Sequence, residues 1–126
     1  MTKIGAVILA AGMSSRMGSS KQLLPLHGKP LIYYPISQAL RQNFDPIVVI
    51  AGKYIKEIEK VMIDYKNVTY LYNQDHQTGM ASSLKLGIEA VSNQVDAVFI
   101  FLGDQPFVPD EVVQKVIEEY KHHRTN

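Results

Sequence analysis

Residues 9–31 have the composition of a loop that binds an anion. Gly12 and Gly18 let the main chain approach a ligand closely, and successive backbone N–H groups in such a loop can form an anion-binding concavity. Arg16 and Lys21 add two positive charges, and the arginine guanidinium suits phosphate oxygens. The spacing matches neither a Walker A motif nor G-x-G-x-x-G, so an ordinary flexible loop stays open as the alternative.

Asp104 is a candidate metal ligand. It follows the most apolar run of the chain, and Asp110 is better placed to begin the next helix. Asp104 therefore has no obvious capping role, although a turn residue is the common alternative. A carboxylate that faces a phosphate-binding loop can hold Mg²⁺, which prefers carboxylate, phosphate and water oxygens.

The stretch NQDHQTGMASSLKLGI holds a third set of polar candidates. Asn73 and the pair Ser82 and Ser83 are suited to contact a base or a ribose. The simpler interpretation is a turn at Gly79, with Thr78 as the N-cap of an amphipathic helix. The spacing alone favours the simpler interpretation.

Four apolar runs rich in β-formers alternate with four helical patterns. The runs predict strands over residues 4–10, 46–52, 68–73 and 96–104. Pro30 is expected in the first turn of the first helix, and Tyr65 on the inner face of the second. The alternation predicts a Rossmann-like three-layer α/β/α fold with a mainly parallel sheet in the order 3-2-1-4. Ligands bind at the carboxyl ends of such strands, where the chain reverses direction. Arg16 and Asp104 are therefore expected to face one cleft.

Bulk composition narrows the class of protein. The chain has 126 residues, a formal net charge of +1 and no cysteine. One domain over residues 1–126 is expected, and neither nucleic acid nor a membrane is an expected partner. The first apolar run is too short to span a membrane, and the absence of cysteine suits a reducing compartment. The cytoplasm is the expected location.

Three segments in the same order give a family resemblance. LAAGMSSRMGSSKQLLPLHGKPLI, GMASSLKLGI and FLGDQPFV resemble the signature of nucleotidyltransferases that act on molybdenum cofactor. The cytidylyltransferases of isoprenoid biosynthesis share a similar opening but differ downstream, where this chain has GMASSL and GDQP. Within the group, LAAG and GDQP resemble the enzymes that use CTP, whereas guanylyltransferases, which use GTP, tend toward LAGG and GDMP.

The resemblance implies transfer of CMP from CTP to the terminal phosphate of molybdopterin, with release of pyrophosphate. Arg16, Lys21 and Asp104 would then be catalytic, and Asp104 would hold Mg²⁺. The implied nucleotide-binding residues are Ala10, Ala11, Gly12, Met13, Ser14, Arg16, Lys21, Asn73, Gly79, Ser82, Ser83 and Gly103.

Members of this family are usually longer, so the sequence is expected to be an N-terminal, nucleotide-binding part of the transferase domain. The sheet is then incomplete, and its exposed edge would be either paired in a homo-oligomer or left prone to aggregation. Two other functions stay open. One is a sugar-phosphate nucleotidyltransferase, and the other is a non-catalytic nucleotide-binding module that serves a molybdoenzyme.

Overall fold

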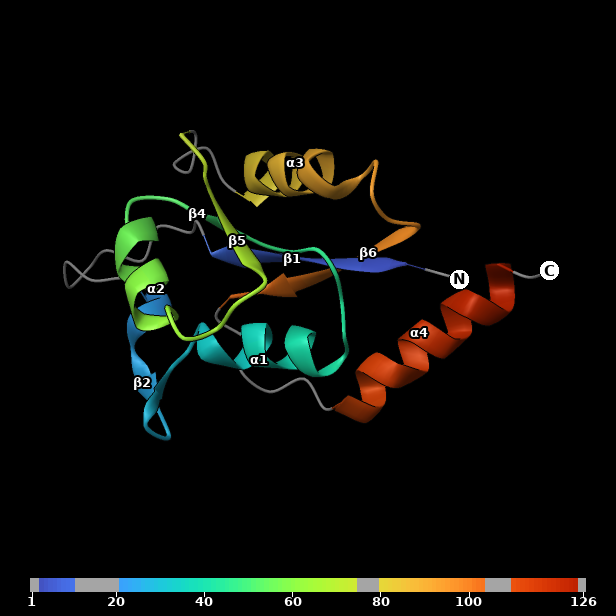
Figure 1. Cartoon of the computed structure of the whole chain (residues 1–126), viewed down its shortest axis with the longest axis horizontal. Helices are drawn as coiled ribbons and strands as arrows, with labels where there is room; N and C mark the ends of the chain where they lie inside the picture. The colour runs from blue at the N-terminus through green and yellow to red at the C-terminus, as the bar shows by residue number, and fades with distance from the viewer. Residues whose placement is uncertain (1–2, 11–20, 75–79, 104–109, 125–126) are drawn as a thin grey trace.

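One parallel sheet forms the centre of the molecule. The computed structural model describes residues 3–10, 21–74, 80–103 and 110–124 (Figure 1). The strands of the sheet are β1 (Ile4–Ala10), β4 (Ile47–Ala51), β5 (Val68–Tyr72) and β6 (Ala97–Leu102). They lie in the order β5-β4-β1-β6, and every pairing is parallel. This confirms the predicted order 3-2-1-4.

Helices cover both faces of the sheet. The helix α3 (Met80–Val91) lies on one face, and α1 (Tyr33–Arg41) and α4 (Asp110–Arg124) lie on the other (Figure 1). The two faces have separate cores, because alternate residues of a strand point to opposite sides. Ile8 belongs to the core beneath α1 and α4, whereas Val7 belongs to the core beneath α3. The three-layer α/β/α prediction is therefore confirmed.

A small hairpin replaces part of the predicted first helix. The strands β2 (Pro25–Leu26) and β3 (Lys29–Pro30) pair antiparallel, so Pro30 lies opposite Pro25. The prediction of Pro30 in a helical turn was wrong. The two residues between the strands, His27 and Gly28, have φ angles of 51° and 81°. Positive φ at both central residues is the geometry of a tight hairpin turn, and it reverses the chain between β2 and β3.

The helix α2 (Ile55–Val61) is shorter than its apolar pattern predicts. Tyr65 lies beyond the helix, where its N–H donates to the Met62 carbonyl at 3.0 Å. Its ring still packs against Tyr33, with the centroids 5.6 Å apart. The chain then reverses at Asn67, which has a φ of 66°. The apolar spacing continues past the helix because the turn is also packed on the core.

The first residue of α4 fastens this helix to α1. The carboxylate of Asp110 accepts hydrogen bonds from Arg41 Nη2 at 3.1 Å and from Gln38 Nε2 at 3.1 Å. The Arg41 guanidinium, followed by the Gln38 amide, lowers the pKa of Asp110. Asp110 therefore begins the helix as predicted. No helix among the described residues is long and apolar enough to cross a membrane.

Candidate nucleotide-binding site

The carboxyl ends of β1 and β6 meet through Ala10 and Gly103. The Gly103 N–H donates to the Leu9 carbonyl at 2.8 Å. A Cβ atom on Gly103 would lie 2.9 Å from that carbonyl oxygen and 3.2 Å from the Ala10 Cβ. Glycine is required here because a side chain would separate the two strand ends. The structure thus brings together two residues of the predicted site, and it places the residue before Asp104 beside β1.

Asn73 fastens the end of β5 to the first turn of α3. Its side-chain Nδ2 donates to Ser82 Oγ at 3.0 Å and to Ser83 Oγ at 2.9 Å. Its backbone N–H donates to the Ala51 carbonyl at 2.9 Å, at the end of β4. Asn73 and Ser83 are buried, with 5% and 2% of their surface exposed, whereas Ser82 is partly exposed. The structure brings the three residues together and gives Asn73 a positioning role, whereas their contact with a base or a ribose stays a prediction.

We expect the variant Asn73→Ala to lower the free energy of unfolding by roughly 1–3 kcal/mol, because the buried hydroxyl of Ser83 and the half-buried hydroxyl of Ser82 lose their shared donor. Urea unfolding of Asn73→Ala, Ser83→Ala and the double variant measures the coupling between the two residues. The exposed Asn93→Ala serves as the matched control. Additive effects of the two substitutions would contradict the role of this hydrogen bond.

Lys21 begins the short 3₁₀ helix η1 (Lys21–Leu23). It is the first described residue after residues 11–20. The next residue, Gln22, accepts a backbone hydrogen bond from the Ile32 N–H at 2.9 Å and is buried. Leu23 packs against the core beneath α1. These contacts fix the backbone that carries Lys21.

Seven predicted site residues lie outside the described residues. They are Ala11, Gly12, Met13, Ser14, Arg16, Gly79 and Asp104. The predicted site residues that the structure does describe are Ala10, Lys21, Asn73, Ser82, Ser83 and Gly103. Within the described part of the chain, no three His, Asp or Glu side chains gather into a metal site.

Sequence reasoning did not find Ala51, which is completely buried at the end of β4. It pairs in register with Ala10 and accepts the hydrogen bond from Asn73. Its position beside Gly52 at the end of an apolar run is the signal that was present in the sequence. Three neighbouring positions at the carboxyl ends of the strands thus carry small residues, Ala10, Ala51 and Gly103. No bulky side chain projects from these three positions.

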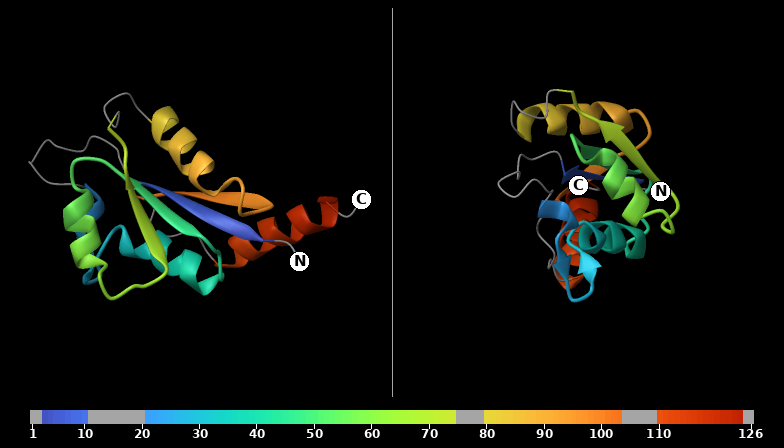
Figure 2. Two further views of the ribbon diagram at one scale, coloured as in Figure 1. Left: turned by 45° about the horizontal axis from the view of Figure 1, so that its top comes forward. Right: turned by 90° about the vertical axis from the view of Figure 1, so that its left-hand side faces the viewer.

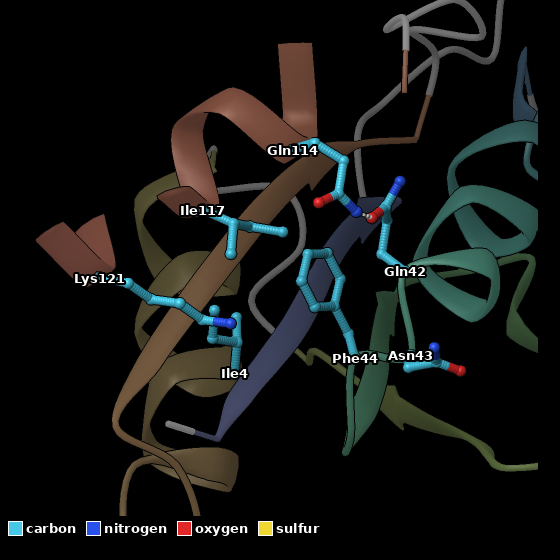
Figure 3. Close-up of a pocket in the computed structure, with 7 residues that line it drawn as sticks. All are labelled: Ile4, Gln42, Asn43, Phe44, Gln114, Ile117 and Lys121. Atoms are coloured by element: carbon cyan, nitrogen blue, oxygen red, sulfur yellow. Dashed lines mark hydrogen bonds between the residues drawn. The ribbon is translucent and has the colours of Figure 1, made fainter. Parts of the chain in front are cut away.

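A cavity of about 150 Å³ lies at the other end of the sheet, near the start of β1. Figure 3 shows Gln42 and Gln114 hydrogen-bonded at its mouth, with Phe44 below them and Lys121 reaching toward Ile4. Its volume is well below the roughly 300–1,000 Å³ of typical small-molecule sites. This cavity is therefore too small for a typical small-molecule ligand.

Residues 6–126 match the family model of the MobA-like NTP transferase domain. The chain belongs to this family. The match includes β1, β4, β5 and β6 together with the residues that join them. The strand ends described above are therefore those of a nucleotidyltransferase domain.

Two curated relatives and one solved structure show the range of this likeness. The chain is 35% identical over 122 residues to a probable molybdenum cofactor guanylyltransferase of Natranaerobius thermophilus. It is 31% identical over 116 residues to the molybdenum cofactor cytidylyltransferase of Escherichia coli. These alignments cover 94% and 92% of this chain but only 55% and 59% of the relatives. A nucleotidyl transferase from Methanothermobacter superposes with a TM-score of 0.80 at 28% identity, over 92% of this chain and 57% of that one.

Proposed function

We propose that residues 1–126 form the nucleotide-binding part of a Mg²⁺-dependent transferase that moves CMP from CTP to the terminal phosphate of molybdopterin and releases pyrophosphate. The observation that supports this most is that Ala10, Gly103 and the Asn73–serine cluster all lie at the carboxyl ends of the strands, with Ala10 and Gly103 in contact. In open parallel sheets a ligand binds at this edge, at the point where the strand order reverses. That point lies between β1 and β6.

The proposed transfer depends more on neutralising the negative charge of the phosphates than on a general base. The attacking phosphate is already an anion, so the barrier lies in bringing two anions together and stabilising the leaving pyrophosphate. In this proposal Arg16 and Lys21 neutralise the triphosphate, while Ala11, Gly12, Met13 and Ser14 offer backbone contacts. Asp104 is the proposed Mg²⁺ ligand, because a carboxylate beside a triphosphate is the donor that this ion prefers. When bound, the ion acts as a Lewis acid and a template.

The choice between CTP and GTP rests on short segments. LAAG at residues 9–12 and GDQP at residues 103–106 favour CTP. The relative named as a cytidylyltransferase supports CTP, but the one named as a guanylyltransferase is similar to nearly the same extent. GTP is therefore the second candidate. A cytoplasmic location is consistent with the absence of cysteine.

Calorimetric titration of the purified chain with CTP and with GTP, each with Mg²⁺, tests the proposal. We expect selective binding of CTP, and an increase of roughly tenfold or more in Kd for Arg16→Ala, because the lost contact is charge-assisted. Arg41→Ala is the matched control, since Arg41 binds Asp110. Selective binding of GTP would identify a guanylyltransferase. Binding of neither nucleotide would contradict the proposal that this chain holds a nucleotide site. In an activity assay, turnover of a sugar phosphate would show that the acceptor is a sugar phosphate and not molybdopterin.

A further inference from the structure

The end of β6 lies closer to β1 than a side chain would allow. The Gly103 N–H donates to the Leu9 carbonyl at 2.8 Å, and a Cβ atom on Gly103 would lie 2.9 Å from the same oxygen. It would also lie 3.2 Å from the Ala10 Cβ. Ordinary van der Waals contacts of a Cβ atom begin at about 3.4 Å. Any side chain at residue 103 would therefore move the two strand ends apart by about half an ångström.

β1 cannot take up this movement, because it is held on both sides. It pairs with β6 through Leu9 and Leu102, and with β4 through Ala10 and Ala51. Figure 2 shows β1 between these two strands. Leu9 and Ala10 are almost completely buried. A side chain at residue 103 would therefore displace the end of β6 and not the end of β1.

The two strand ends lead into the residues proposed to hold the triphosphate and its metal ion. Ala10 directly precedes residues 11–20, which include Arg16, and Gly103 directly precedes Asp104. Consecutive Cα atoms are joined at a fixed distance of about 3.8 Å, so a displacement of residue 103 is passed on to residue 104. The contact at Gly103 therefore controls the separation between the points from which the two chain segments of the proposed site begin.

We propose that Gly103 is a positioning residue that adapts the metal site to Mg²⁺ in preference to Ca²⁺. This inference rests on the proposed function, in which Asp104 is the metal ligand. Mg²⁺ requires near-octahedral coordination at about 2.0–2.1 Å, whereas Ca²⁺ accepts flexible coordination at about 2.3–2.6 Å. Coordination distances in a metal site vary by only about 0.2 Å. A displacement of about half an ångström at Gly103 is therefore too large for Mg²⁺ but can be accommodated by Ca²⁺.

Calorimetric titration of the whole chain with CTP tests this role in three conditions, namely with Mg²⁺, with Ca²⁺, and with a chelator and no added metal. For Gly103→Ala we expect the Kd of CTP to rise roughly tenfold with Mg²⁺, the lower end of the cost of losing a residue that supports a metal ligand. The rise should be clearly smaller with Ca²⁺. Without metal, the variant and the parent chain should bind CTP alike, because the displacement acts on the metal ligand.

Gly5→Ala is the matched control near the opposite end of β1. A Cβ atom at Gly5 would lie 3.1 Å from Val95 Cγ1 and 3.2 Å from the Pro46 carbonyl oxygen. The substitution therefore introduces similar crowding between a strand and its neighbours, but away from the proposed site. Gly5→Ala should lower the stability in urea and leave the Kd of CTP unchanged with either ion.

The double variant Ala10→Gly/Gly103→Ala removes the contact at 3.2 Å and should recover part of the Mg²⁺-dependent affinity. It also takes the place of Gly103→Ala in the titrations if the single variant does not fold. Equal rises in Kd with Mg²⁺ and with Ca²⁺, or an unchanged Kd with Mg²⁺, would overturn the positioning role and leave the proposed function in place. Absence of CTP binding by the parent chain would overturn the proposed function, and this inference with it.

Discussion

Replacing Asp104 by alanine is expected to abolish Mg²⁺-dependent nucleotidyl transfer while the fold is retained. In the proposed function its carboxylate supplies the protein oxygen for the ion that compensates the triphosphate charge. Loss of one well-placed charged group in such a site lowers the rate roughly 100-fold or more. The measurement is pyrophosphate release with CTP and molybdopterin, together with Mg²⁺-dependent binding of CTP by calorimetry. Both should fall, and the thermal unfolding temperature should stay close to that of the parent chain.

The matched control for this variant is Asp96→Ala, at the opposite end of the same strand. The Asp96 carboxylate accepts a hydrogen bond from the Lys3 backbone N–H at 2.7 Å. It lies one residue before β6, at the amino edge of the sheet. Asp96→Ala should therefore leave metal-dependent binding of CTP unchanged. Full metal-dependent turnover by Asp104→Ala would remove this residue from the metal site.

Replacing Gly87 by leucine is expected to give the largest loss of stability in the chain. A Cβ atom at Gly87 would lie 2.4 Å from Val7 Cγ1 and 3.3 Å from Ile50 Cγ1. Both neighbours are completely buried in central strands, so neither can move away without disturbing the sheet. Overpacking typically costs about 1–3 kcal/mol, and a branched side chain at a contact this short should reach or exceed the upper value. The smaller gain in helix propensity, about 1 kcal/mol, does not compensate.

Urea unfolding compares Gly87→Leu with Lys85→Leu, which introduces the same residue at an exposed position of α3. We expect a loss of about 3 kcal/mol for the first variant and a change within about 0.5 kcal/mol for the second. An intermediate loss is expected for Gly87→Ala. Equal stability of the two leucine variants would show that α3 can lift from β1 and β4 at little cost.

The sheet could be predicted from the sequence because its signals are local and repeated. The run IGAVILA predicts a buried strand over residues 4–10, and β1 has these bounds. The hairpin at Pro30 could not be predicted in this way, since strands of two residues have no periodicity. The bonds from Asn73 to the serines depend on how β5 and α3 meet in space. The sequence placed these residues in one polar stretch, but it could not indicate that Asn73 is buried and uses its amide to hold two hydroxyl groups.

The hydrogen bonds at the strand ends have a consequence for how this domain can change through evolution. Asn73 is tied to the serines of α3, Gly103 to Leu9, and Asp110 to α1. Residues 75–79 and 104–109 are thus inserted between bonded partners that belong to the scaffold. The hydrogen bonds named here are made by residues outside these two segments. Under the proposed function, in which Gly79 and Asp104 contact the nucleotide and its metal, exchange of these short segments between relatives is expected to change base or acceptor preference without redesign of the sheet.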